Sequence, residues 1–194
     1  MPLLPIKIYG DPVLRETAEK IEQEHVTDEF RQFARDMAET MYANSGIGLA
    51  ANQVGDLRRI FVVDTAQVEE NGSKSRRKKD PQKRELHVFL NPEVVESSLE
   101  DEAYTEGCLS IPEVEADVYR PIRVKVRYRT LDWQEKEQWF EGLLARVFQH
   151  ELDHLNGVLF VDHLPAASRL KLAGALNKLK KSSEEELAAQ SNLS

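Results

Sequence analysis

The HExxH string at residues 150–154 constrains the fold and chemistry of this 194-residue chain more than any other feature. Hydrophobic periodicity independently predicts a helix over 143–155, so the string lies on a helix. Two histidines four residues apart then lie one turn apart on one face, where His150 and His154 can bind one metal ion. Glu151 is offset by about 100°, which suits a general base that activates water without ligating the metal. The alternative is a pair of ordinary histidines beside a solvated acid.

A catalytic metal site takes three protein ligands and keeps one position open for water, so a third ligand is needed. Phe160 stands where the long zinc-protease pattern has its third histidine, and the only glutamates after the motif are at 184–186. Asp162 and His163 remain as downstream candidates. Upstream, Cys108 is the single cysteine, lies between strand-like segments, and is free for metal or nucleophilic chemistry. One thiolate with two imidazoles suits Fe(II), Zn(II), Co(II) or Ni(II), although Cys108 could also be a small buried hydrophobic residue.

A run of small residues, GIGLAANQ at 46–53, follows the first predicted helix. It lacks the lysine of a phosphate-binding loop, and the third glycine of a dinucleotide fingerprint is absent. Gly46 and Gly48 would let a strand run close to a substrate backbone, and Gln53 offers an amide donor. A tightly packed turn is the alternative.

The order of predicted elements favours a single α+β domain over residues 1–181, because strands and helices do not alternate regularly. The last residues, 182–194, are acidic and then small and polar, which predicts a flexible tail. A long polar loop is expected over 68–85. The predicted elements are a helix at 27–43 with Thr27 as N-cap, strands at 59–64 and 86–90, an antiparallel hairpin from 122 to about 140, the motif helix at 143–155 and a last helix at 165–181.

The charge distribution is uneven, although the net charge is −8 from 26 basic and 34 acidic residues. Segment 74–84 has seven basic residues and segment 169–181 has five. Such segments are compatible with docking on RNA, but solvated loops and helix faces more often explain them. The chain has no run of about 20 apolar residues that could span a membrane. A lone cysteine and an N-terminus without a secretion signal predict the cytoplasm.

Three strings in this order, GIGLAANQ (46–53), EGCLS (106–110) and QHELDH (149–154), together resemble the peptide deformylase family. YGDPVLR at 9–15 is similar to the family's opening, so the resemblance covers about residues 5–165. It implies an α+β fold with mixed or antiparallel sheets around the motif helix. It also implies bound Fe(II), with Zn(II), Ni(II) or Co(II) accepted. By this resemblance Cys108, His150 and His154 hold the metal, Glu151 is the acid/base, and Gln53 with the backbone N–H of Leu109 forms the oxyanion site.

The implied reaction is hydrolysis of the formyl group from the N-terminal formyl-methionine of nascent peptides, with release of formate. Arg120 matches a basic position in relatives and could support Asp153, or both could be exposed surface charges. An HExxH metallopeptidase and an RNA-associated, ribosome-docking module remain as alternative functions. The residues expected to contact substrate are Gly46, Ile47, Gly48, Gly107, Leu143 and Val147.

Overall fold

A five-stranded sheet and a two-stranded sheet enclose one central helix. We describe residues 3–66 and 84–191 of a computed structural model. The main sheet has the order β1-β2-β3-β6-β7, and β4 pairs with β5. In chain order the elements are η1 (Pro12–Arg15), η2 (Gln23–His25), α1 (Asp28–Ala43), β1 (Gly48–Ala50), η3 (Ala51–Val54), β2 (Ile60–Val63), β3 (His87–Ser97), β4 (Asp101–Cys108), β5 (Ile111–Pro121), β6 (Arg123–Arg129), β7 (Glu135–Glu141), α2 (Gly142–Leu155), η4 (Phe160–His163) and α3 (Ala166–Ser191), where η denotes a 3₁₀ helix.

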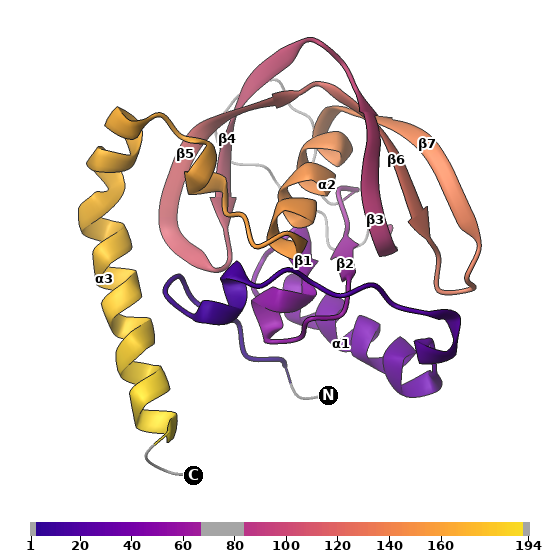
Figure 1. Ribbon diagram of the computed structural model, residues 1–194, viewed down its shortest axis with the longest axis horizontal. Helices are drawn as coiled ribbons and strands as arrows, with labels where there is room; N and C mark the ends of the chain where they lie inside the picture. The colour runs from indigo at the N-terminus through magenta and orange to yellow at the C-terminus, as the bar shows by residue number, and fades with distance from the viewer. Residues whose placement is uncertain (1–2, 67–83, 192–194) are drawn as a thin grey trace.

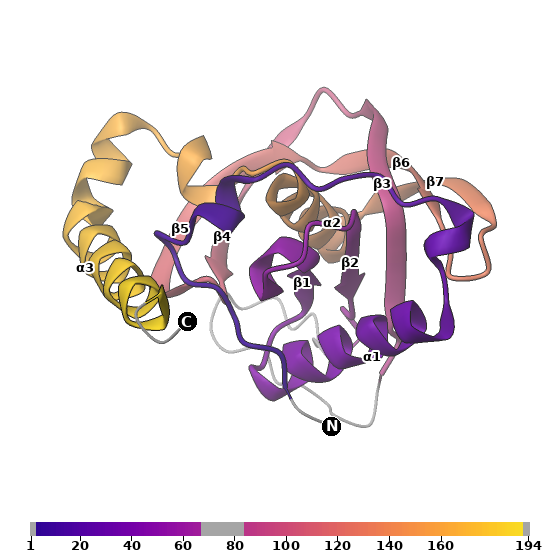
Figure 2. The same cartoon turned by 60° about the horizontal axis from the view of Figure 1, so that its bottom comes forward.

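The helix α2, which carries the HExxH string, lies between the β4–β5 ribbon and the larger sheet in both views (Figures 1 and 2). Each pair of neighbouring strands in the two sheets is antiparallel. Helix α1 packs near β1 and β2, whereas α3 lies on the outer side of β5 (Figure 2). The predicted α+β class with antiparallel sheets around the motif helix is therefore confirmed.

Aromatic packing fixes α2 on the main sheet. Phe148 of α2 is fully buried, and its ring centroid lies 5.1 Å from that of Phe61 and 5.2 Å from that of Phe89, both edge-to-face. Phe140 of β7 closes the cluster at 5.5 Å from Phe148. Large buried aromatic rings dominate core energetics, so this cluster anchors the helix that presents the two histidines.

The helices predicted at 27–43 and 143–155 are both present, as α1 and α2. Helix α1 begins after Thr27, whose hydroxyl accepts a hydrogen bond from the N–H of Phe30. The expected apolar stripe is buried at Phe30, Met37 and Met41. Helix α2 begins one residue earlier than predicted, at Gly142. The predicted hairpin is also confirmed as β6 and β7, with Val124 and Val126 of the alternating strand fully buried.

The strand predicted to end at Leu90 is longer than expected. It continues through Pro92 to Ser97 as β3, and its pairing with β6 shifts register between Leu90 and Glu93. A proline can lie within a strand at such a bulge, where its missing N–H costs no ladder hydrogen bond. The side chain of Asn91 binds the backbone N–H and C=O of Ile21 and holds the bulge in place.

The predicted end of the last helix near Lys181 is wrong, since α3 continues to Ser191. A long-range contact accompanies the extra turns: the hydroxyl of buried Ser183 donates to the carbonyl of Ile8 at 3.3 Å. Gly10 also lies against the backbone of Lys180, where a Cβ atom would approach to 2.8 Å. The N-terminal segment therefore packs against the end of the predicted helix, at Lys180, and against Ser183 in the first residues of the predicted tail. The assignment of residues 1–181 to one domain stays a prediction.

Most of the predicted polar loop, and of the basic segment 74–84, lies outside the described residues. Arg84 is described, and its guanidinium stacks 4.2 Å from the ring centroid of Tyr42. Within 3–66 and 84–191, no helix has both the length and the apolar character needed to cross a bilayer.

Candidate metal centre and substrate cleft

The end of β4 and one face of α2 bring together the three predicted metal ligands. Cys108 ends β4, and His150 and His154 follow each other by one turn of α2. One donor atom from each of the three lies within 4.8 Å of the others. Cys108 Sγ lies 3.2 Å from His154 Nε2. Two imidazoles and a thiol that converge in this way form a donor set suited to a borderline-soft divalent metal.

The downstream candidates do not join this group. Asp162 accepts hydrogen bonds from Arg15 and from the N–H of Leu159, and His163 contacts Asp153. Phe160 instead packs its ring on that of His150, with centroids 6.2 Å apart. Of the candidates for a third ligand, only Cys108, upstream in the sequence, lies with the two histidines among the described residues.

Burial gives the two histidines different electrostatic surroundings. Burial, reinforced by nearby His150, lowers the pKa of His154 well below its ordinary value, which keeps that ring in the neutral form that binds metals. Burial alone would also lower the pKa of His150. The Cys108 thiol and the Glu106 carboxylate outweigh it and raise that pKa well above its ordinary value.

A buried network of charged side chains, which we call the Glu106 cluster, lies behind His150. It comprises Glu106, Arg120, Arg146 and Asp153. Glu106 Oε2 lies 2.8 Å from His150 Nδ1, and Arg120 donates to both oxygens of Glu106 at 2.7 and 3.0 Å. Burial alone would raise the pKa of Glu106, but hydrogen bonds from His150 and Arg120 lower it to about 2. The carboxylate is thus ionised and holds Nδ1 of the ring, which leaves Nε2 as the nitrogen available to a metal.

The rest of the cluster was only partly predicted. The expected pair of Arg120 and Asp153 is present, with Arg120 Nη1 donating to Asp153 Oδ2 at 2.6 Å, and Arg120 is 4% exposed. Arg146 was missed, although it precedes His150 by four residues on α2 and so shares its face. A charged residue in that otherwise apolar stripe was the available signal. Arg146 donates to Glu106 and to the carbonyls of Glu102 and Val118.

Glu151 is a buried acid with one oxygen unused. It is 4% exposed, and among the described residues its Oε2 has no hydrogen-bond partner. Burial raises its pKa to about 7, against the opposing effect of His150. A carboxyl group with a pKa near neutrality can both take and return a proton. Gly48 of β1 leaves room for it, because a Cβ atom there would collide with the Glu151 carboxylate.

Gln53 has a fixed side-chain amide. It belongs to η3 and is 1% exposed. Its Oε1 accepts from the N–H of Ala50 at 2.8 Å, and its Nε2 lies 3.2 Å from Ser110 Oγ and 3.5 Å from Cys108 Sγ. The amide N–H groups therefore point toward Ser110 and Cys108, beside the candidate metal site. Leu109, in the turn between β4 and β5, lines the same cleft.

A cleft of about 980 Å³ opens in front of these groups. It is lined by α2, by the start of β1 and by the β4–β5 ribbon. Ile6, Ile8 and Tyr104 also line it and were not predicted. The six residues expected to contact substrate all line it: Gly46, Ile47, Gly48, Gly107, Leu143 and Val147.

Comparisons with known proteins agree with this geometry. The polypeptide deformylase family model matches residues 3–170. The chain is 47% identical to a peptide deformylase of Bradyrhizobium diazoefficiens, over 95% of this chain and 98% of that protein. It is 42% identical to one of Mesorhizobium japonicum, over 96% of both chains.

Solved structures give the same result. A peptide deformylase of Plasmodium falciparum superposes with a TM-score of 0.81 at 33% identity, covering 93% of this chain and 98% of that one. One from Synechococcus elongatus, in complex with actinonin, gives 0.77 at 40% identity, covering 92% and 87%. By sequence, fold and site, this chain belongs to the peptide deformylase family.

Proposed function

We propose that Cys108, His150 and His154 hold a single divalent metal ion and that Glu151 moves the proton in the deformylation reaction. Enzymes of this family are metal-dependent and remove the N-formyl group from nascent peptides, and this is the reaction of the chain. The observation that carries the assignment is the convergence of one thiol and two imidazoles within 4.8 Å. The neutral state favoured for His154 and the ionised Glu106 behind His150 both support ligation.

The donor set favours Fe(II) as the native metal, with Zn(II), Ni(II) or Co(II) as substitutes. A thiolate with two imidazoles is poorly suited to the hard cations magnesium and calcium, which prefer oxygen ligands. When bound, such an ion acts as a Lewis acid toward a carbonyl oxygen and lowers the pKa of water.

Glu151 is the proposed acid and base. Its free Oε2 accepts the proton of the attacking water as the water oxygen adds to the formyl carbon. The carboxyl group then returns that proton to the amine nitrogen as the C–N bond breaks, which releases formate and the free N-terminus. The pKa of about 7 fits both halves of this exchange.

Gln53 and the N–H of Leu109 are the proposed donors to the formyl oxygen. Charge develops on that oxygen when the carbonyl becomes tetrahedral, and donors held in place beforehand stabilise it. Hydrogen bonds to Ala50 and Ser110 fix the Gln53 amide before substrate arrives. Removing one such donor typically lowers the rate by about 10²- to 10³-fold.

The methionine side chain is proposed to lie against Ile47, Leu143 and Val147. These apolar residues line the cleft beside the ligand helix, and Val147 precedes His150 and Glu151 by about one turn. Gly46, Gly48 and Gly107 allow the peptide backbone to approach closely. A formyl hydrogen is small enough for this site, whereas an acetyl methyl group would crowd it.

The decisive experiment measures formate release from formyl-Met-Ala-Ser by anaerobically purified protein of known metal content. The same protein is assayed for cleavage of internal bonds in an unformylated peptide. We expect formate release alone. Cleavage of internal bonds without formate would support the alternative of an HExxH metallopeptidase.

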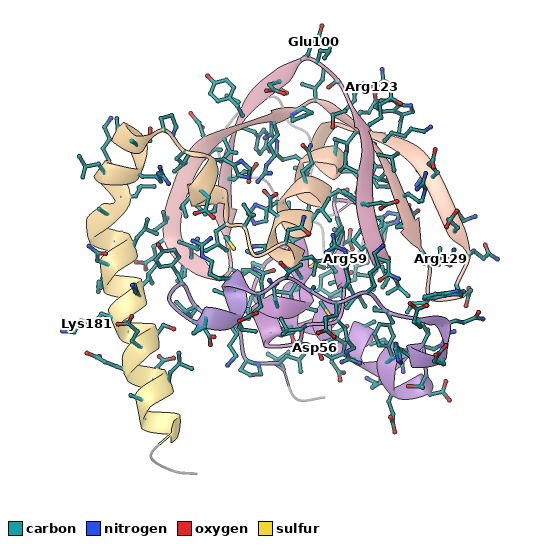
Figure 3. The ribbon with its side chains drawn as sticks, in the orientation of Figure 1. Asp56, Arg59, Glu100, Arg123, Arg129 and Lys181 are labelled. Carbon is teal, nitrogen blue, oxygen red and sulfur yellow. The ribbon has the colours of Figure 1, made fainter. Side chains whose placement is uncertain are left out.

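We also propose that the enzyme works in the cytoplasm and docks on ribosomal RNA through its basic segments. All five basic residues of segment 169–181 are exposed on α3, and Figure 3 labels one of them, Lys181. Lys180 and Lys181 lie 3.8 Å from the carboxylates of Glu184 and Glu185. The test is salt-dependent cosedimentation with ribosomes. We expect that replacing Arg169, Lys171 and Lys178 with Gln weakens it, and unchanged cosedimentation would exclude α3 as the docking element.

A further inference from the structure

Two glutamates of β5, Glu113 and Glu115, stand at the solvent side of the cleft. Both line the cleft, and both are exposed. Glu115 is paired in register with Gly107 of β4. A Cβ atom built on Gly107 would lie 3.7 Å from Oε1 of Glu115. The carboxylate therefore lies beside the backbone that leads directly into Cys108.

These two carboxylates determine the charge that the cleft presents to a peptide. No described residue forms an ion pair or a side-chain hydrogen bond with either of them. The one arginine of the cleft, Arg146, is 7% exposed and is committed to Glu106 and to two backbone carbonyls. The accessible charge on the described cleft wall is therefore negative.

The cleft is too large for formyl-methionine alone. A volume of about 980 Å³ is at the upper end of the range for small-molecule sites. The reacting carbon must lie at the metal centre, and an extended peptide advances about 3.3 Å per residue. Because Gly107 adjoins Cys108, the residues that follow methionine pass Glu115 within the first few positions.

We propose that Glu113 and Glu115 make the enzyme prefer nascent peptides that carry a lysine or arginine within the first three residues after methionine. The preference rests on the proposed function, since it concerns residues downstream of the deformylated methionine. Ion pairs at exposed sites are weak and screened by salt. We therefore expect a spread of about 2- to 10-fold in kcat/KM between a lysine peptide and the matching glutamate peptide.

The test uses metal-loaded enzyme and formyl-Met peptides amidated at the C-terminus, which removes the competing terminal carboxylate. A single Lys, Gln or Glu is placed at the second, third or fourth residue. The expected order of kcat/KM at the responsive position is Lys above Gln above Glu. This spread should shrink from about 0.01 M to about 1 M ionic strength, where the Debye length falls from about 30 to about 3 Å. Equal values at all three positions, or the reverse order, would overturn the proposal.

Variants assign the effect to residues. Glu115→Gln and the double variant with Glu113→Gln should reduce the spread stepwise, and Glu115→Lys should invert it. The matched control is Glu100→Gln, which removes one charge at the turn between β3 and β4, outside the cleft lining (Figure 3). That control should keep the full spread. A full spread in the double variant would overturn the assignment to these glutamates.

Failure of this inference differs from failure of the proposed function. If the neutral Gln peptides release formate without any charge preference, only the inference fails. If no formylated peptide releases formate, the proposed function fails as well.

Discussion

The Glu106 cluster and the β6–β7 hairpin contain similar ion pairs in opposite surroundings. Glu106 and Arg120 have side chains only 4% and 5% exposed. On the hairpin, Glu137 pairs with Lys125 and Arg127, but its side chain is 35% exposed and that of Arg127 is 44% exposed. Water can replace the partners on the hairpin but not in the cluster. Burial, rather than the number of ion pairs, therefore decides which charged side chains hold α2 in place.

The largest expected effect comes from removing the buried charge. Glu106→Gln leaves Arg120 and Arg146 buried with too little compensating charge, so the free energy of unfolding should fall by about 3–5 kcal/mol. Urea denaturation of metal-loaded protein measures the change. A loss below about 1 kcal/mol would mean that water reaches the cluster, and the contrast between the two regions would collapse.

Gly48→Ala extends the comparison to a second buried acid, Glu151, by placing a methyl group against its carboxylate. The added methyl group would collide with the Glu151 carboxylate and lie 2.8 Å from Val147 Cγ1. We expect a loss of about 1–3 kcal/mol in stability and a lower kcat, since the carboxylate must move.

Gly174→Ala on α3 is the matched control, because nothing lies within 4 Å of a Cβ atom there. It should stabilise the protein by about 0.5–1 kcal/mol and leave kcat unchanged. Thermal denaturation and formate release on the same samples separate the two outcomes. If the Gly48→Ala enzyme is active and as stable as the wild type, the Glu151 carboxylate has more space around it than the structure shows.

The half-exposed ion pair of Arg15 and Asp162 is intermediate between the buried Glu106 cluster and the exposed β6–β7 hairpin. Burial alone would raise the pKa of Asp162, but hydrogen bonds from Arg15 and the N–H of Leu159 lower it below its ordinary value of 3.8. A lowered pKa stabilises the fold above the unfolded-state value, and this contribution disappears as the pH falls through the folded-state pKa. Asp162→Asn should therefore cost about 0.5–1 kcal/mol at neutral pH. The difference from wild type should narrow below pH 3.8, and urea denaturation across pH measures it. A difference that stays constant down to the acid limit would contradict the ion pair.

The smallest effect belongs to the hairpin. Hydrogen bonds from Lys125 and Arg127 lower the pKa of Glu137, yet the group lies at the surface, where solvent screens its charge. Glu137→Gln should leave the urea midpoint unchanged within error. A shift comparable to that of Glu106→Gln would remove the distinction between the two regions.

Local patterns predicted the elements that local interactions define. Helix α2 was predicted to within one residue because its apolar periodicity and its end signals agree. Asn91 binds Ile21 at the bulge next to Pro92, and Ser183 binds Ile8 in the part of α3 that was not predicted. Such contacts between distant segments leave no periodic trace in the sequence.

The candidate site likewise combines residues that the sequence predicts with residues whose contacts only the fold shows. The ligand set could be proposed from the HExxH spacing and the lone cysteine. Glu106 lay inside the EGCLS string without a role, and only the fold shows that Arg120 and Arg146 meet it. The charge of the cleft wall likewise depends on the register that places Glu115 opposite Gly107.

The central claim is that one thiol and two imidazoles bind a single metal ion. X-ray absorption spectroscopy of anaerobically metal-loaded protein, with metal content measured on the same sample, tests it most directly. We predict one metal per chain with one sulfur and two imidazole nitrogens as protein ligands, and loss of the sulfur signal in Cys108→Ser. A fully loaded wild-type site without sulfur ligation would contradict the account.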